Sequence, residues 1–198
     1  MDAISKKTAR KNSRGFTLVE LMVSVSVFVI IMVISMGSIL SIFDANRKSQ
    51  SLRTVMDNLN FTLETMTRTI RFGTNYHCDI NYTPISSTRD CNGGASSIAV
   101  TSSGGNTVTY RLVSGANYGR IVRTDSSVNS GADYNITSSD VTITSLTFRV
   151  VGSPLCSSGD LFQPMVIITI NGNAGVKATV KSSFSLQTTV SQRMFDSQ

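Results

Sequence analysis

The hydrophobic pattern of this chain changes twice along its length, and each stretch predicts a different kind of structure. The first stretch is an uncharged, mostly apolar run of 23 residues from Leu21 to Phe43. A helix rises about 1.5 Å per residue, so this run reaches about 35 Å and can cross a hydrocarbon core about 30 Å thick. We therefore predict a transmembrane or assembly helix over residues 16–43 that is apolar on nearly every side.

The second stretch, residues 44–73, predicts an amphipathic continuation of the helix. Apolar residues recur at spacings of three and four, which places them on one helical face, and charged residues lie largely elsewhere. Gly73 is the predicted stop. The apolar face consists of Leu52, Met56, Leu59, Leu63, Met66 and Ile70. We expect this face to pack on the chain's own globular domain; a coiled-coil interface with a partner is the alternative.

Residues 74–198 predict a globular β-rich domain. A loop is expected from Thr74 to about Ser97, because this segment holds Pro84 and the Gly93-Gly94 pair. Beyond it, β-rich segments are separated by Gly, Ser and Asn clusters, and the sequence Asn171-Gly-Asn-Ala-Gly predicts a hairpin turn. The expected strands are 97–101, 107–113, 120–124, 141–151 (with one slip near Ser145), 165–171, 175–181 and 183–190. The predicted fold class is α+β, a long N-terminal helix packed on an antiparallel β-sheet.

A short basic leader over residues 1–15 precedes the apolar run. Its basic residues are Lys6, Lys7, Arg10, Lys11 and Arg14. With Asp2 they give the leader 5 − 1 = +4 of the formal net charge of +6, which leaves about 6 − 4 = +2 for the rest of the chain. Positive segments stay on the cytoplasmic side of a membrane. We therefore expect a cytoplasmic N-terminus, with the β-rich domain outside the cytoplasm.

The junction of leader and apolar run carries a motif, Arg14-Gly-Phe-Thr-Leu-Val-Glu20. It resembles the processing signal of type IV pilins and of type II secretion pseudopilins. The resemblance implies that prepilin peptidase cuts between Gly15 and Phe16 and N-methylates Phe16. Glu20 is then the fifth residue of the mature chain, the position of the family's assembly glutamate. The family fold, a long helix packed on a sheet, agrees with the pattern above.

Glu20 also has a physical rationale. A carboxylate in the bilayer costs about 2.5–3.5 kcal/mol on insertion scales, so such a residue is usually kept for a partner. Cleavage creates an ammonium at Phe16, about 6 Å along the helix from Glu20. Glu20 of one subunit can then pair with the Phe16 ammonium of its neighbour and fix the helix register. The alternative is an ordinary membrane anchor whose Glu20 extends to the lipid interface.

The cysteines fit a location outside the cytoplasm, where disulfides persist. Cys78 and Cys91 enclose 12 residues, and a disulfide there would stabilise the fold by about 3 kcal/mol. We predict this pairing among the three possible ones, which leaves Cys156 over. His77 is the only histidine and is expected to be a solvated loop side chain. We expect no metal site and no cofactor.

No catalytic motif is found in the sequence, and the protein is expected not to be an enzyme. Aspartates that fall in predicted turns are expected to form those turns rather than to bind calcium. They are Asp125, Asp133, Asp140 and Asp160. Dispersed cations could form a DNA-binding stripe, but a solvated sheet face explains them as well. They are Arg111, Arg120, Arg123, Lys177 and Lys181.

These observations predict a structural subunit of a type IV pilus or a secretion pseudopilus. The size of the chain and the sequence Ser145-Leu-Thr-Phe-Arg149 look more like a minor subunit than a major one. The family implies four partners: prepilin peptidase, other pilin subunits, an inner-membrane assembly platform and, before assembly, membrane lipid. The assembled filament would lie in the periplasm or at the cell surface. Two alternatives stay open: a bitopic anchored ligand-binding protein that does not polymerise, and an exported enzyme on an anchor.

Overall fold

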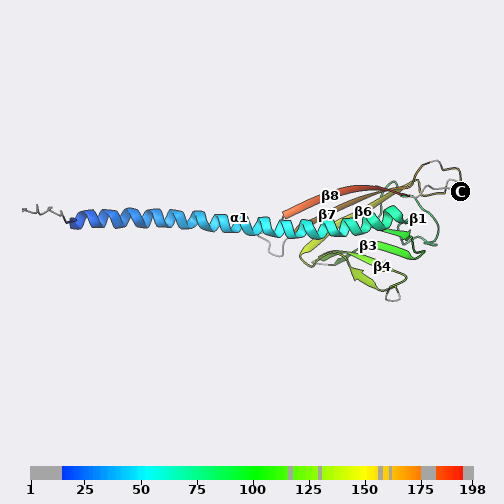
Figure 1. The fold of residues 1–198 in the computed structure, drawn as a ribbon, viewed down its shortest axis with the longest axis horizontal. Coiled ribbons are helices and arrows are strands. Elements are labelled where there is room, and N and C mark those ends of the chain that lie inside the picture. The colour runs from blue at the N-terminus through cyan, green and yellow to red at the C-terminus, as the bar shows by residue number, and fades with distance from the viewer. Residues whose placement is uncertain are drawn as a thin grey trace, which may run out of the picture. The chain divides into compact units, whose positions relative to one another are not determined.

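The long hydrophobic pattern forms one helix, α1 (Leu18–Phe72), of 55 residues (Figure 1). The structure is a computed structural model that describes residues 15–115, 118–128, 131–155, 158–160, 162–174 and 182–193. The chain divides into two compact units, Met1–Arg47 and Lys48–Gln198. Helix α1 contributes its first part to one unit and its second part to the other. The predicted helix is therefore confirmed, and it ends one residue before Gly73.

The unit Lys48–Gln198 adds two antiparallel sheets to the second part of α1. The first sheet has the strand order β1 (Thr74–Cys78), β2 (Ser97–Thr101), β3 (Thr107–Gly115), β4 (Tyr118–Asp125) and β5 (Asp133–Asn135). The second has the order β6 (Val141–Val151), β7 (Met165–Ala174) and β8 (Ser182–Ser191). Neighbouring strands follow one another in sequence, as in a meander. The α+β class is confirmed, with two sheets in place of the single one predicted.

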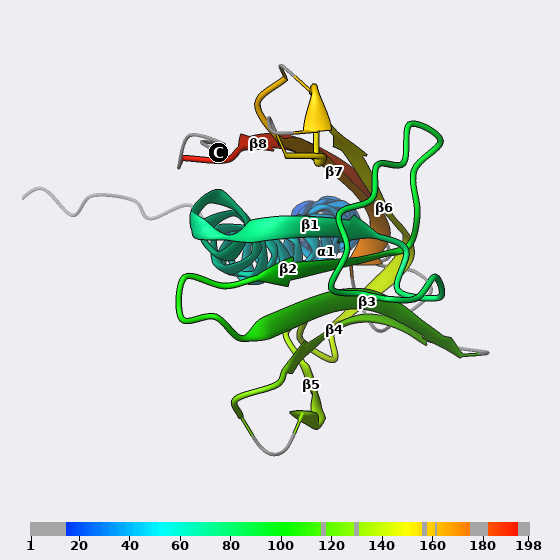
Figure 2. The same ribbon diagram turned by 90° about the vertical axis from the view of Figure 1, so that its right-hand side faces the viewer.

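The second part of α1 lies between the two sheets, which curve around it (Figure 2). Its buried residues are Val55, Leu59, Thr62, Met66 and Ile70, while Leu52, Met56 and Leu63 are partly buried against the same core. The predicted apolar face is thus confirmed, but it is wider than the sequence pattern. Because sheets cover the helix from two sides, Val55 and Thr62 are buried as well. The Thr62 hydroxyl lies 2.8 Å from the carbonyl oxygen of Ile136 and 2.9 Å from that of Asn58.

Strand β6 joins the two sheets. Phe148 of β6 exchanges two backbone hydrogen bonds with Ala95, at 2.8 and 2.7 Å. At the other end of β6, Gly119 approaches so closely that an added Cβ would lie 1.8 Å from the carbonyl oxygen of Ile143. Only glycine allows such an approach of two backbones. The predicted slip near Ser145 is confirmed as a register shift between Ile143 and Ser145.

Residues 171–174 do not form the predicted hairpin turn, and Gly175 lies outside the described residues. Strand β7 continues through Ala174, and Gly172 pairs with Phe184 of β8. A Cβ on Gly172 would lie 2.6 Å from Cζ of Phe184, so the glycine makes room for an aromatic ring on the sheet. The predicted strand 175–181 lies outside the described residues. The prediction also missed β5, which has only three residues.

The end of α1 is closed by Gly73 and Tyr76. Gly73 does not adopt a left-handed conformation; a Cβ there would lie 2.3 Å from Cγ1 of Val100, so close packing is what requires glycine. The hydroxyl of Tyr76 lies 2.7 Å from the carbonyl oxygen of Ile70 and 2.9 Å from that of Gly73. The last carbonyls of a helix have no partner within the helix. The hydroxyl of Tyr76 supplies such a partner. Burial of Tyr76 raises the pKa of its phenol.

The segment predicted as a loop from Thr74 to Ser97 begins with β1, so that part of the prediction was wrong. His77 was expected to be solvated, but it is 1% exposed in β1. Its Nδ1 lies 2.7 Å from the carbonyl oxygen of Ser87 and its Nε2 2.9 Å from that of Tyr82. The predicted disulfide between Cys78 and Cys91 is present, with a Cα–Cα distance of 5.9 Å. Strand β1, the histidine and the disulfide together fix the following loop to the core. Cys156 lies outside the described residues.

Candidate processing and assembly site

The proposed cleavage position, between Gly15 and Phe16, lies just before α1. Residues 15–17 are not helical, and α1 begins at Leu18. Gly15 is exposed, and no heavy atom lies within 4 Å of the place a Cβ would occupy. Phe16 is 82% exposed. The peptide bond between them is therefore non-helical and open, which is the geometry a protease requires.

Thr17 caps the start of α1. Its hydroxyl oxygen accepts a hydrogen bond from the backbone N–H of Glu20 at 3.3 Å. A threonine followed three residues later by a glutamate is the pattern of a capping box, which satisfies N–H groups at a helix start. This role was not predicted, although the pattern Thr17-Leu-Val-Glu20 contains it. Glu20 therefore lies in the first turn, where the helix dipole favours a negative charge.

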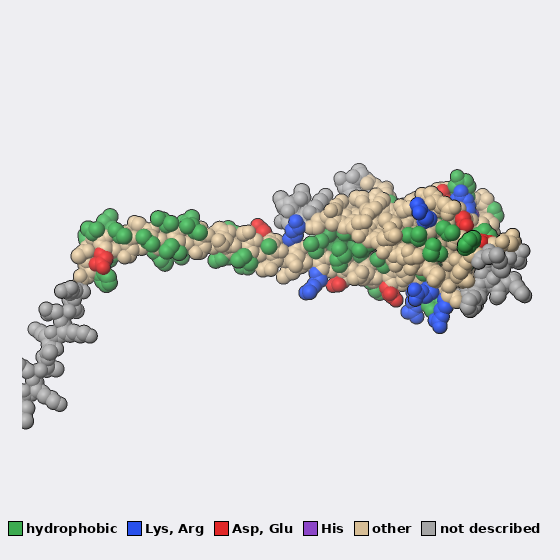
Figure 3. All heavy atoms as spheres, turned by 90° about the horizontal axis from the view of Figure 1, so that it is seen from above, with side chains coloured by type: hydrophobic (Ala, Val, Ile, Leu, Met, Phe, Trp, Pro, Cys, Tyr) green, Lys and Arg blue, Asp and Glu red, His purple; other side chains and the backbone are tan. Residues whose placement is uncertain are grey.

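The apolar part of α1 has no covering within its own unit. Every large hydrophobic side chain from Phe16 to Phe43 is at least half exposed, and α1 is the one described helix long and apolar enough to cross a membrane. In Figure 3, hydrophobic side chains follow one another along this part of the helix, and one acidic side chain lies near its start. Glu20 is the only acidic residue between Gly15 and Phe43. A surface of this kind needs lipid or other helices around it.

Three serines on this surface bond within the helix. The hydroxyls of Ser24, Ser26 and Ser38 donate to the carbonyl oxygens four residues earlier, at 2.7, 2.8 and 3.3 Å. Such bonds let serine enter an apolar environment without an unmet donor. Gly37 leaves an open space on the helix surface, with no heavy atom within 4 Å of an added Cβ. The carboxylate of Glu20 is thus the one charged group on this part of α1.

The structure brings Gly15, Phe16 and Glu20 within one turn of the helix start. The leader residues Lys6, Lys7, Arg10, Lys11 and Arg14 lie outside the described residues.

The predicted stripe of cations is divided between the two faces of its sheet. Arg111 lies opposite Val122, whereas Arg123 lies opposite Tyr110, so the two arginines point to opposite faces. Arg111 forms an ion pair with Asp133, which lies in β5 and not in a turn as predicted. Lys177 and Lys181 lie outside the described residues. Arg120 lies opposite Val113 and shares the face of Arg111, so two of these arginines lie on one face of the sheet and Arg123 lies on the other.

Asp125 forms a turn, as predicted. One of its carboxylate oxygens accepts hydrogen bonds from the Ser127 hydroxyl and backbone N–H, at 2.6 and 3.0 Å. The other accepts a bond from Arg123 at 2.8 Å. These contacts, the Ser127 hydroxyl first among them, lower the pKa of the Asp125 carboxyl group. Within the described parts of the chain, no three His, Cys, Asp or Glu side chains are grouped as a metal site would need.

Together, the exposed apolar helix and the antiparallel β domain define a class, the α+β proteins with a pilin-like fold. The family described as the prokaryotic N-terminal methylation motif matches residues 10–36. The chain therefore carries the prepilin-type processing signal of type IV pilins and pseudopilins. This motif marks structural subunits and does not define an enzyme family. No curated protein and no solved structure matches the chain.

Proposed function

We propose that this chain is the precursor of a structural, non-enzymatic subunit of a type IV pilus or a type II secretion pseudopilus. Prepilin peptidase cleaves it between Gly15 and Phe16 and methylates the new N-terminus of Phe16. Two observations support this step: the motif over residues 10–36 and the open, non-helical backbone at residues 15–17. Gly15 lets the enzyme approach the backbone closely because it has no side chain.

The observation that carries the proposal is the uncovered apolar surface from Phe16 to Phe43, in which Glu20 is the one charged residue. Before assembly, lipid covers the side chains from Phe16 to Phe43, and the leader keeps the N-terminus cytoplasmic. In the filament, the same surface is covered by copies of this helix from other subunits. The serines that bond within the helix allow both environments.

Glu20 selects the register of this assembly. After cleavage its carboxylate pairs with the methylated ammonium of Phe16 on a neighbouring subunit. Methylation keeps the charge of the amine, so the pair survives the modification. Within a bundle of apolar helices the attraction is strong, and a Glu20 without a partner is penalised. The cap at Thr17 holds Glu20 in the first turn, close to where the new N-terminus forms.

In this account the chain has four parts with separate roles. Residues 1–15 are the leader, 16–43 the assembly helix, 44–73 the amphipathic helix and 74–198 the β domain. The subunit is a minor one and is delivered by an inner-membrane assembly platform to a filament in the periplasm or at the cell surface. The alternative function is that of a bitopic protein that binds a ligand and does not polymerise. Such a protein would also have a membrane anchor and a β domain, but it would not need cleavage at Gly15.

Intact mass tests the processing step directly. The chain is co-expressed with a prepilin peptidase, purified from membranes and weighed. The proposal expects loss of residues 1–15 and the addition of one methyl group at Phe16. Gly15→Leu should abolish the shift, because a bulky side chain blocks the approach to the bond, while Gly37→Leu, the same change at a glycine within α1, serves as the matched control. A mature chain that begins at Met1 in the presence of active peptidase would favour the bitopic anchor.

A further inference from the structure

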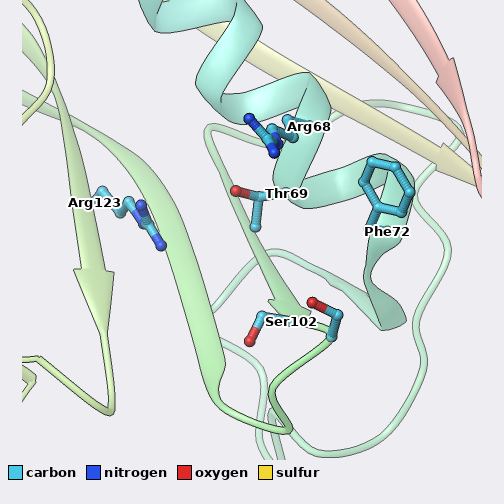
Figure 4. Close-up of a pocket in the computed structure, with 6 residues that line it drawn as sticks. Arg68, Thr69, Phe72, Ser102 and Arg123 are labelled. Carbon is cyan, nitrogen blue, oxygen red and sulfur yellow. The ribbon is translucent and has the colours of Figure 1, made fainter.

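A cavity of about 380 Å³ lies beside the last turns of α1 in the unit Lys48–Gln198. Its lining residues are Arg68, Thr69, Phe72, Ser102, Ser103 and Arg123. Figure 4 shows Arg123 extending from β4 toward the helix, while the nitrogen atoms of Arg68 lie on the side of the helix that faces Arg123. Two guanidinium groups therefore face one space from two different elements. None of the lining residues is acidic.

Arg123 is held in place before any ligand arrives. It forms an ion pair with Asp125 at 2.8 Å, and its side chain is only 20% exposed. Its guanidinium carbon lies 6.0 Å from the ring centre of Tyr110 and 5.7 Å from that of Tyr134. The Nε atom of Arg123 is buried and has no hydrogen-bond partner among the described residues. A buried donor without a partner is unfavourable, so an acceptor that comes within hydrogen-bond distance of this atom stabilises the protein.

Arg68 supplies the second charge. It is exposed, and its side chain makes no ion pair or hydrogen bond with the part of the chain that the structure describes. Thr69 cannot contribute a donor, because its hydroxyl already donates to Thr65 at 3.0 Å while accepting from Tyr110 at 3.0 Å. The donors that remain are the two guanidinium groups and the hydroxyls of Ser102 and Ser103.

We propose that this cavity binds a phosphate group. Each guanidinium group can donate two parallel hydrogen bonds to two phosphate oxygens. The guanidinium groups of Arg68 and Arg123 together present more donors than the two oxygens of a carboxylate can use. A tetrahedral phosphate has acceptors for both arginines and for the serine hydroxyls. The ring of Phe72 borders the cavity and offers an apolar surface to the organic part of a phosphate ester. The ligand is therefore inorganic phosphate or a small phosphate ester.

A different role for Arg68 must be separated from this one. A cation near the C-terminus of a helix is stabilised by the helix dipole. If that is its only role, replacing Arg68 lowers the stability of the protein without changing its response to phosphate. The proposal instead expects the response to phosphate itself to depend on Arg68.

The test uses the full chain in an uncharged, phosphate-free detergent at constant ionic strength. Thermal unfolding and calorimetry are measured with inorganic phosphate, glycerol phosphate and adenosine monophosphate, for the wild type, Arg68→Gln and the control Arg53→Gln. Arg53 is an exposed arginine of the same helix that does not line the cavity. We expect saturable binding with a rise in Tm for the wild type and the control, and binding about tenfold weaker or worse for Arg68→Gln.

Tighter binding of one ester than of inorganic phosphate would identify a phosphate ester as the ligand, and equal binding would show that the phosphate group alone is recognised. Absence of saturable binding to all three probes would overturn the proposal. An equal response of the three proteins would do the same, because it would show a general effect of ions. Neither result bears on processing at Gly15, which the mass measurement tests separately.

Discussion

The two parts of α1 are built from the same kinds of apolar residue, yet they meet opposite surroundings. From Phe16 to Phe43 the side chains are exposed, whereas Val55, Leu59, Met66 and Ile70 are buried by the chain's own sheets. The difference follows from pattern, since the second part has one apolar face and the first is apolar all round. A helix with one apolar face can be covered by its own domain. A helix that is apolar on every side requires lipid or other subunits.

Leucine substitutions in the two parts test this contrast with the largest expected effect. Leu59 is buried at the centre of the core, so Leu59→Ala should lower the free energy of unfolding of the β domain by about 2–5 kcal/mol. Leu40 is exposed, so Leu40→Ala should leave it unchanged. Chemical denaturation in detergent, followed by the aromatic signal of the β domain, measures both. Equal losses in the free energy of unfolding for Leu59→Ala and Leu40→Ala would contradict the contrast between the buried and the exposed part of α1.

The disulfide lies in the unit Lys48–Gln198, which covers its own apolar residues. Its removal should have the next largest effect on the free energy of unfolding. Replacing both Cys78 and Cys91 with serine removes the covalent link of the loop that β1 and His77 hold against the core. We expect a loss of about 3 kcal/mol in the free energy of unfolding. Denaturation with and without a reducing agent gives the same comparison for the wild type. If reduction left the midpoint unchanged, the disulfide would have no stabilising role.

Tyr76 tests how the buried part of α1 ends. Tyr76→Phe keeps the ring but leaves the carbonyls of Ile70 and Gly73 without the phenol donor, which should cost about 1–3 kcal/mol. Tyr82→Phe is the matched control, because Tyr82 is exposed and Phe keeps the ring that Arg89 covers at 3.6 Å. Thermal unfolding of the two variants should differ clearly. Similar melting of the two would show that the cap is dispensable.

The smallest expected effect concerns the pH dependence set by Asp125. Hydrogen bonds, the one from the Ser127 hydroxyl first, lower its pKa in the folded state below the ordinary value of 3.8. The carboxylate therefore adds stability above about pH 4, and this stability is lost as the pH falls toward the lowered pKa. Asp125→Asn should be less stable than the wild type at neutral pH, and the gap should narrow below pH 4. A gap that is constant from pH 7 to pH 3 would contradict this role.

Much of the architecture can be predicted from hydrophobic pattern because both parts of α1 and most strands are strongly periodic. The strand β1 could not be predicted in this way. Its sequence Thr-Asn-Tyr-His-Cys looks polar, and the burial of His77 depends on carbonyls of Tyr82 and Ser87 that only the folded loop supplies. The turn predicted at Gly172 failed for a related reason, because that glycine serves the ring of Phe184 across the sheet.

The candidate processing site is local in sequence, so a motif of a few residues is enough to indicate it. The arrangement of the arginines is not local. Arg111 and Arg123 differ in which face of the sheet they occupy, which depends on strand alternation and register. The cavity shared by Arg68 and Arg123 requires the packing of α1 against the first sheet. No spacing in the sequence predicts it.

We propose that Glu20 lies in the apolar part of α1 because a neighbouring subunit provides its partner. The measurement that tests it most directly is the amount of subunit recovered in purified filaments when Glu20→Ala and, as a control, Glu64→Ala replace the wild type in cells that carry the assembly machinery. We expect Glu20→Ala to be cleaved at Gly15 and retained in the membrane but absent from filaments, with Glu64→Ala incorporated normally. Incorporation of Glu20→Ala at the wild-type level would contradict the account.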